Sequence, residues 1–323
     1  MEYVILIISI LAIVYGADNL VSGAVTIARK FKISDFVIGA VIVGIGTSLP
    51  ELFVSADGAW QGRVDVAIGN VVGSNIFNVL GILGLTAIIY PLPVARGNMR
   101  FELPYCIFVS VLAMLLTYNF FDGDTLLIGR VDGVLFLLLF VAFLYISFLR
   151  DKRQSVAKLA ANDSTTIVSE PSVGKVWLAV LRVVGGLVVL IAGCHYFVEE
   201  AVVLATKWGV DEAFISITLI ACGTSLPELS ASLVAAVKRN TDLALGNVVG
   251  SNIFNITFIL GVSSQISPLS GGGITPIDYA VMIGAAVMLF LFGLSGRISR
   301  LAGLVMLAAF VAYNYYLILP QIQ

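Results

Sequence analysis

Two glutamates with the same neighbours lie 177 residues apart in this sequence. Glu51 lies in the stretch GTSLPEL, Glu228 lies in an identical stretch, and the block GNVVGSNIFN follows each of them at the same distance. Both carboxylates stand beside a proline and among hydroxyls and amides, in segments that otherwise indicate membrane spans. Because an acid buried in lipid is unfavourable, it marks an ion pathway or binding site by default. The duplication therefore predicts two copies of one ion-binding unit.

The proline of each GTSLPEL stretch lacks an N–H group and clashes with the preceding turn, so a membrane helix kinks or unwinds there. Carbonyls freed by such a break are the usual cation ligands of discontinuous transport helices, which makes Gly44 and Ala221 candidate ligands. Where the helix continues, Thr47 and Ser48 present their hydroxyls near Glu51. The second copy repeats this arrangement with Thr224, Ser225 and Glu228.

The block GNVVGSNIFN places Asn70, Ser74 and Asn78 at i, i+4 and i+8, which is one face of a helix. Glycines four residues apart in each block let a neighbouring helix approach closely. We expect the four motif helices to pack together with the two glutamates at the centre. Asn70 and its counterpart are candidates for direct ligation, and capping or bridging of helices explains them almost equally well. The second copy carries Asn247, Ser251 and Asn255 at these positions.

The predicted ligands are carboxylate, hydroxyl, amide and backbone oxygens, with no histidine or lysine in either motif. Hard cations suit such a site, and Ca²⁺ takes about six to eight oxygen ligands. Zn²⁺ or Cu⁺ would call for thiolate or imidazole. Two carboxylates in a dry site repel each other unless cations or protons neutralise them. Occupancy by one Ca²⁺, by several Na⁺ or by protons is then mutually exclusive, which is the physical basis of exchange.

The composition predicts an integral membrane protein. The 323 residues are 59% hydrophobic and 12% charged, with a mean hydropathy of +1.03, so polar surface is too scarce for a water-soluble protein. Long continuous apolar runs, each near or above the ~20 residues that a membrane helix needs, exclude a β-barrel. We expect an all-α protein with ten transmembrane helices, broken at the ion site. The spans are expected at about 3–26, 34–60, 66–92, 103–120, 128–149, 176–205, 213–236, 243–268, 276–294 and 301–319.

The basic residues predict the orientation, because Lys and Arg collect on the cytoplasmic side. With both termini outside, 15 of the 18 fall inside. Five spans precede a polar linker and five follow it, so the second half enters the membrane from the opposite face. Such inverted repeats commonly build a midplane site that is reached alternately from either side. The expected organisation is a first repeat over 1–150 with motif segments 39–56 and 68–85, a cytoplasmic linker over 151–175, and a second repeat over 176–323 with motif segments 216–233 and 245–262.

Other residues with chemical potential have plainer explanations. His195 is the only histidine and has no counterpart in the other copy, so it is expected to pack or to lie at the interface. Glu199 and Glu200 are expected to reach the outer interface, with a role in ion entry as the less favoured alternative. Neither motif pairs a nucleophile with a base. We therefore expect no enzyme activity, no cofactor, no nucleic-acid partner and no obligatory protein partner.

The paired GTSLPE and GNxxGSN blocks resemble the alpha-1 and alpha-2 repeats of the calcium/cation antiporter superfamily, specifically its sodium/calcium exchanger branch of the prokaryotic type. The match directly covers about 39–85 and 216–262. In that family the two motif glutamates are the principal ion ligands, joined by motif hydroxyls and backbone oxygens. The candidate metal ligands are accordingly Glu51, Glu228, Thr47, Ser48, Thr224, Ser225, Ser74, Ser251, Asn78, Asn255, Gly44 and Ala221.

Both repeats end in asparagine, at Asn78 and Asn255, whereas some relatives, including potassium-coupled ones, carry an aspartate in the second repeat. This difference from the potassium-coupled relatives argues against potassium co-transport. The resemblance implies alternating access in a plasma membrane, with Na⁺ flowing down its gradient, Ca²⁺ moving the other way, and the first and sixth spans sliding across a fixed core. Two facing glutamates could equally bind protons, so a Ca²⁺/H⁺ antiporter is the alternative, and a cation channel is a third hypothesis.

Overall fold

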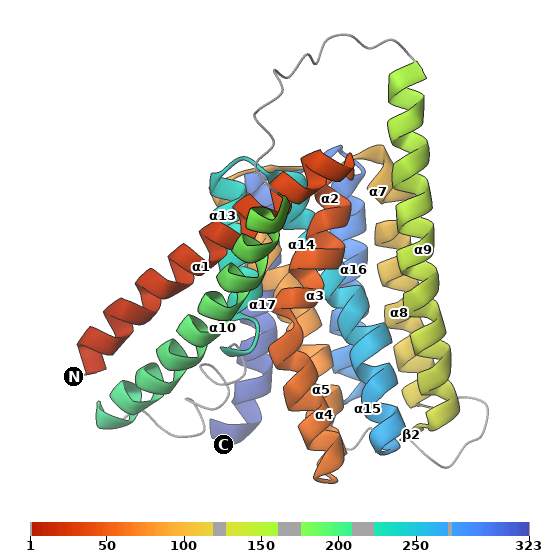
Figure 1. Ribbon diagram of the computed structural model, residues 1–323. Coiled ribbons are helices and arrows are strands. Elements are labelled where there is room, and N and C mark those ends of the chain that lie inside the picture. Colours follow the sequence, from red (N-terminus) through yellow and green to blue (C-terminus); the bar gives the residue numbers. More distant parts are fainter. Residues whose placement is uncertain (1, 119–126, 161–175, 209–222, 271–272, 323) are drawn as a thin grey trace.

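The computed structural model describes residues 2–118, 127–160, 176–208, 223–270 and 273–322. Nearly all of these residues are helical, with short π-helical segments and two-residue strands between them (Figure 1). The first half contains α1 (Glu2–Phe31), α2 (Asp35–Ile38), η1 (Gly39–Val43), α3 (Gly44–Thr47), α4 (Leu49–Trp60), α5 (Val64–Ile76), η2 (Phe77–Leu83), α6 (Gly84–Ile89), β1 (Leu92–Pro93), α7 (Arg96–Arg100), α8 (Glu102–Thr117), β2 (Leu127–Ile128) and α9 (Arg130–Ala160). The second half contains α10 (Val176–Lys207), α13 (Leu226–Val237), α14 (Thr241–Phe254), η4 (Asn255–Ile259), α15 (Leu260–Ile266), β3 (Leu269–Ser270), α16 (Pro276–Gly293), β4 (Arg297–Ile298) and α17 (Arg300–Ile322).

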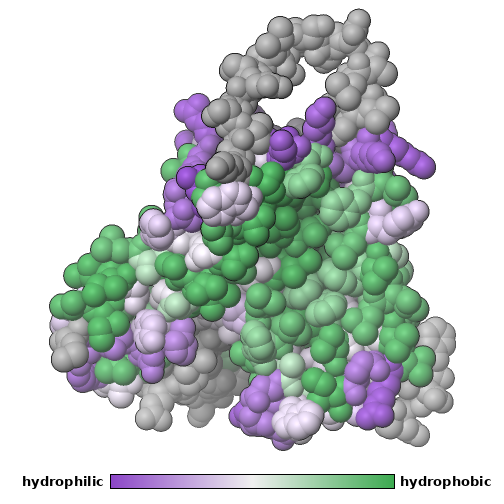
Figure 2. All heavy atoms as spheres, in the orientation of Figure 1, coloured by the Kyte–Doolittle hydropathy of each residue, from purple (hydrophilic) through white to green (hydrophobic). Residues whose placement is uncertain are grey.

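Eight helices within the described ranges are long and apolar enough to cross a membrane, and Asp35–Thr47 with Leu49–Trp60 forms a ninth candidate that is bent by 46°. Figure 2 shows hydrophobic side chains over the middle of one face and hydrophilic ones gathered toward its two ends. The chain is therefore a multi-pass membrane protein. Eight of the ten predicted spans match these helices, and the second matches the bent pair. The seventh, predicted over 213–236, lies partly outside the described residues, which show its end as α13.

Helix α9 extends farther than we predicted. It continues to Ala160, whereas the linker was expected to begin at residue 151. Lysine, arginine, glutamine and alanine are good helix formers in water, so this helix can leave the membrane without ending. The rest of the predicted linker, 161–175, lies outside the described residues.

Helices α1 and α10 pack along each other at one side of the molecule (Figure 1). Glycines allow the close approach, since a Cβ on Gly186 would lie 2.6 Å from the backbone nitrogen of Leu20 and 2.7 Å from the carbonyl oxygen of Gly16. The pair shares a small hydrophobic cluster with alanines of the second half, such as Ala231 and Ala235. A larger cluster unites the other helices around α14, which is buried along almost its whole length. The α1–α10 pair is thus packed separately from the main core.

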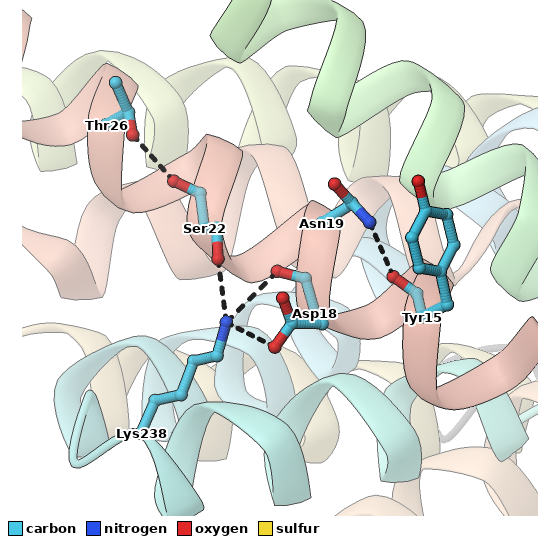
Figure 3. Close-up of polar contacts among 6 residues, drawn as sticks. All are labelled: Tyr15, Asp18, Asn19, Ser22, Thr26 and Lys238. Carbon is cyan, nitrogen blue, oxygen red and sulfur yellow. Dashed lines mark hydrogen bonds and ion pairs between the residues drawn. The ribbon is translucent and has the colours of Figure 1, made fainter. Parts of the chain in front are cut away.

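A polar contact also ties α1 to α13. The Nζ of Lys238 lies 2.5 Å from Oδ1 of Asp18, and it donates to Ser22 Oγ at 2.7 Å and to the Asp18 carbonyl at 3.3 Å (Figure 3). The Lys238 and Asp18 side chains are 31% and 53% exposed. Exposed ion pairs typically contribute about 1 kcal/mol or less. Packing, rather than this ion pair, accounts for most of the attachment of α1.

Two short strand pairs join the halves of the chain. Strand β1 pairs antiparallel with β4, so that Leu92 faces Ile298, and β2 pairs antiparallel with β3, so that Leu127 faces Ser270. One strand of each pair comes from each half. These strands were not predicted, because two residues are too few to show the alternation that identifies a strand.

The glycine contact between α1 and α10 can be tested with two adjacent residues. Gly186→Ala should destabilise the protein by about 1–3 kcal/mol, as overpacking does elsewhere, because the atoms that it meets are backbone atoms that cannot turn aside. Gly185→Ala is the matched control, since an added Cβ there meets no described atom within 4 Å. Thermal unfolding of the purified protein in detergent measures both. Equal melting temperatures for the two variants would contradict the contact.

Candidate cation site

The backbone breaks just before each motif proline. Ser48 separates α3 from α4 with φ −83° and ψ 8°, and Ser225 precedes α13 with φ −92° and ψ 7°. A proline occupies the first turn of each following helix. Backbone N–H groups in a first turn have no partner within the helix, so the missing N–H of proline costs no hydrogen bond there. Glu51 and Glu228 also lie in these first turns. The helix dipole there favours a negative charge.

Each carboxylate accepts a hydrogen bond from the serine of the other copy. Ser48 Oγ donates to Oε1 of Glu228 at 2.7 Å, and Ser225 Oγ donates to Oε1 of Glu51 at 2.8 Å. Both carboxylates are fully buried, and the reciprocal serine bonds hold them in one cluster, where two negative charges would repel each other. The contact that we expected within one copy is replaced by a contact between copies, because the helix breaks at the serine itself.

The other motif hydroxyls surround the same carboxylates. Those of Thr47 and Ser251 lie beside the second glutamate, and that of Thr224 lies beside the first. Ser74, the counterpart of Ser251, is buried and donates to the carbonyl four residues earlier. The structure therefore brings the predicted hydroxyls of both copies into one cluster or beside it.

The Gly44 carbonyl lies at the crossing of the two halves. It accepts from the backbone N–H of Ser48 and from Ser251 Oγ, each at 3.1 Å. The sequence predicted that the break would free this carbonyl. It is instead hydrogen-bonded, because the N–H of Ser48 still completes the last turn before the break. Its predicted counterpart, Ala221, lies outside the described residues.

Asn70 and Asn247 bridge helices. Asn70 Nδ2 donates to the carbonyl of Glu51 at 3.1 Å and to Ser55 Oγ at 2.9 Å. Asn247 repeats both bonds in the second copy, at 3.2 and 2.9 Å. The sequence left open whether these residues ligate the ion or cap or bridge helices. In the structure their amide nitrogens bridge helices, because they hold the helix that carries each glutamate against the helix that follows.

Asn78 is the second residue of the π-helical segment η2, Asn255 is the first residue of η4, and both are fully buried. Segment η2 packs against α13, and η4 packs against α4, so each asparagine belongs to a segment that contacts the helix carrying the other copy's glutamate. Their Nδ2 atoms donate to Oδ1 of Asn252 and Asn75, at 3.0 and 3.2 Å. Asn252 and Asn75 were not among the predicted site residues, although their repetition in both GNVVGSNIFN blocks was a signal that could have identified them.

Five buried oxygens of the motif residues have no hydrogen-bond partner among the described residues. They are Oε2 of Glu51, Oε2 of Glu228, Oγ1 of Thr224, Oδ1 of Asn78 and Oδ1 of Asn255. Buried charges and polar atoms without partners are strongly unfavourable. Within the described part of the chain no three His, Cys, Asp or Glu side chains come together, so the donors here are mostly neutral oxygens around two acids. This donor set fits a hard cation such as Ca²⁺ or Na⁺.

A cavity of about 590 Å³ adjoins the cluster. Asn70, Ser74 and Thr224 line it together with Asp278 and Tyr313. Asp278 accepts from the Tyr313 hydroxyl at 2.8 Å and caps the start of α16, so it is engaged in holding that helix. The cavity leaves room for small ions beside the motif hydroxyls.

Comparison with known proteins adds four findings. A family model described as sodium/calcium exchanger protein matches residues 1–149 and 178–319. Inner membrane protein YrbG of Escherichia coli (strain K12) is 38% identical over 291 residues, which are 88% of this chain and 86% of that protein. Sodium/calcium exchanger MaX1 of Methanosarcina acetivorans is 32% identical over 97% of both chains. A solved structure of the sodium-calcium exchanger NCX_Mj, soaked with zero Na⁺ and Ca²⁺, superposes with a TM-score of 0.83 at 30% identity over 98% of both chains.

The bridging asparagines yield a prediction with a built-in comparison. Asn247→Leu should lower the free energy of unfolding by about 1–3 kcal/mol, because it leaves a buried carbonyl and a buried hydroxyl without their donor. Asn70→Leu removes the same two bonds at a position that lines the cavity, where water can replace the donor, so its effect should be smaller. Thermal unfolding in detergent measures the difference. A larger loss in Asn70→Leu would contradict this assignment.

Proposed function

The chain belongs to the sodium/calcium exchanger family, and on that basis we propose that it is a secondary active antiporter that exchanges Na⁺ for Ca²⁺ across a plasma membrane. The reciprocal serine–glutamate bonds carry this proposal, because they join two buried carboxylates from opposite halves in one oxygen cluster. MaX1 and NCX_Mj are named as sodium/calcium exchangers, which supports the choice of ions. YrbG is named as an inner membrane protein, which supports the plasma membrane.

Charge balance explains why one cluster can exchange two ions. Two buried carboxylates carry two negative charges, which one Ca²⁺ neutralises completely and which Na⁺ ions neutralise one at a time. Both kinds of ion would use the same oxygens, so binding of one displaces the other. The ligands in this proposal are the two glutamates, with further oxygens from Thr47, Ser48, Thr224, Ser225, Ser74, Ser251, Asn78, Asn255, Gly44 and Ala221, of which the last lies outside the described residues.

Two inverted five-helix repeats, over 1–150 and 176–323, would give this site access from both faces. The hydrogen bonds that recur at the offset of 177 residues support the repeat. Both labelled termini in Figure 1 lie away from the upper end, where α9 ends. Together with the distribution of Lys and Arg, this supports external termini and a cytoplasmic linker over 151–175.

We infer that alternation moves α1 and α10 together across the remaining helices. These two helices pack on each other along their length and belong to a hydrophobic cluster separate from the main core, so they can shift as one unit. The tie between Lys238 and Asp18 is partly exposed and therefore inexpensive to break. Such a shift would open the oxygen cluster to one face while closing it to the other.

The function is tested by ⁴⁵Ca²⁺ uptake into Na⁺-loaded proteoliposomes, with and without external Na⁺. Uptake should require the outward Na⁺ gradient. Glu51→Gln and Glu228→Gln should each lower it at least tenfold, because loss of one charge leaves Ca²⁺ incompletely neutralised in a buried site. Asp57→Asn is the matched control, since Asp57 lies on the same helix as Glu51 with an exposed side chain. Full uptake in either glutamate variant would refute the proposed site.

The same vesicles separate sodium coupling from proton coupling. An imposed pH gradient without Na⁺ should drive no Ca²⁺ uptake if Na⁺ is the coupling ion. Uptake that follows the pH gradient and ignores Na⁺ would instead establish a Ca²⁺/H⁺ antiporter at the same two glutamates. Uptake that needs neither gradient and greatly exceeds the rate of a carrier would indicate a channel.

A further inference from the structure

Asn75 and Asn252 occupy equivalent positions in the two GNVVGSNIFN blocks and meet each other where α5 crosses α14. Both are almost completely buried, at 1% and 3% exposure. Asn75 Nδ2 donates to the backbone carbonyl of Asn252 at 3.3 Å, and Asn252 Nδ2 donates to the backbone carbonyl of Asn75 at 3.2 Å. The two residues thus form a reciprocal clasp between the halves.

The clasp determines which way each amide faces. A backbone carbonyl can only accept a hydrogen bond, so the nitrogen of each clasp amide must face the carbonyl and its Oδ1 must face away. Those Oδ1 atoms accept from the next pair of amides: Asn252 Oδ1 from Asn78 Nδ2, and Asn75 Oδ1 from Asn255 Nδ2. Four amide orientations therefore follow from two backbone carbonyls.

The orientation of the clasp in turn determines the orientation of the Asn78 and Asn255 amides. With their nitrogens engaged by the clasp, Asn78 and Asn255 must turn their own Oδ1 atoms away from it. These two oxygens are buried and receive no donor from the described residues. An amide turned the other way would direct an N–H donor at the position that its oxygen now faces, and N–H groups repel cations.

We propose that Asn75 and Asn252 are positioning residues, which hold Asn255 and Asn78 with their amide oxygens toward the transported cation. This inference rests on the ion site of the proposed function and assigns to it two residues that touch no ion themselves. The role is specific to an amide ligand. A carboxylate at position 255 would present an oxygen in either orientation and would need no such guidance.

That specificity separates positioning from packing. Asn75→Leu removes the acceptor that holds the Asn255 amide, so the half-saturating Ca²⁺ concentration of Na⁺-dependent uptake should rise about tenfold. In an Asn255→Asp background, the same Asn75→Leu change should alter that concentration by less than about twofold relative to Asn255→Asp alone. A merely structural asparagine would produce the same shift in both backgrounds.

Asn70→Ala is the control, because Asn70 also bridges buried helices but makes none of the clasp bonds. Its effect on the half-saturating concentration should be equal in the two backgrounds. Asn252→Leu, with and without Asn78→Asp, repeats the test in the other half, and Asn75→Ala provides a smaller side chain in case leucine prevents folding. Thermal unfolding of every variant confirms that folded proteins are compared.

Two outcomes would overturn the positioning role. Both require that the natural protein transports Ca²⁺ in exchange for Na⁺. The first is an unchanged half-saturating Ca²⁺ concentration in folded Asn75→Leu or Asn75→Ala. The second is an equal shift of that concentration in the natural and Asn255→Asp backgrounds. Absence of Na⁺-dependent uptake in the natural protein would instead overturn the proposed function. In that event, the Ca²⁺ concentration that gives half of the maximal thermal stabilisation replaces transport as the readout, and the comparison of backgrounds decides the positioning role in the same way.

Discussion

Glu51 and Glu228 are fully buried among apolar helices, where two negative charges cannot persist without compensation. The local irregularities of the structure follow from this constraint. The helices break at Ser48 and Ser225, which places each carboxylate in a first helical turn, where the dipole favours it. The breaks also let each serine hydroxyl donate a hydrogen bond to the carboxylate of the opposite copy. What these contacts leave unsatisfied are oxygens, which is why the cluster suits a hard cation.

The contacts around the glutamates bind the two halves of the chain to each other. Neither half can assemble the cluster alone, because each carboxylate takes its serine from the opposite copy and the asparagine clasp exchanges bonds between α5 and α14. The two short strand pairs join the halves again at the ends of the helices. A cluster shared in this way responds as a unit, so a movement of one half relative to the other changes the environment of both carboxylates at once.

Much of this architecture could be predicted from the sequence, since apolar runs of ~20 residues identify membrane helices directly. Eight spans and the bent second span were confirmed, and the proline breaks lie where the motif indicated. Two local expectations differ from the structure. Ser48 was expected near Glu51 if the helix continued, and a break was expected to free the Gly44 carbonyl, but the turn at Ser48 directs its hydroxyl to Glu228 and keeps the carbonyl bonded. Asn75 and Asn252 escaped notice because their partners lie in the other half.

By itself the sequence determined the membrane class, the duplication and the identity of the two glutamates, because hydropathy and repetition depend only on the order of residues. The tertiary structure decided which hydroxyl meets which carboxylate and which way each amide faces. Those choices depend on atoms from residues about 180 positions apart. Hydrogen-bond direction is set only when such atoms are brought together, so no local pattern in either copy could have revealed it.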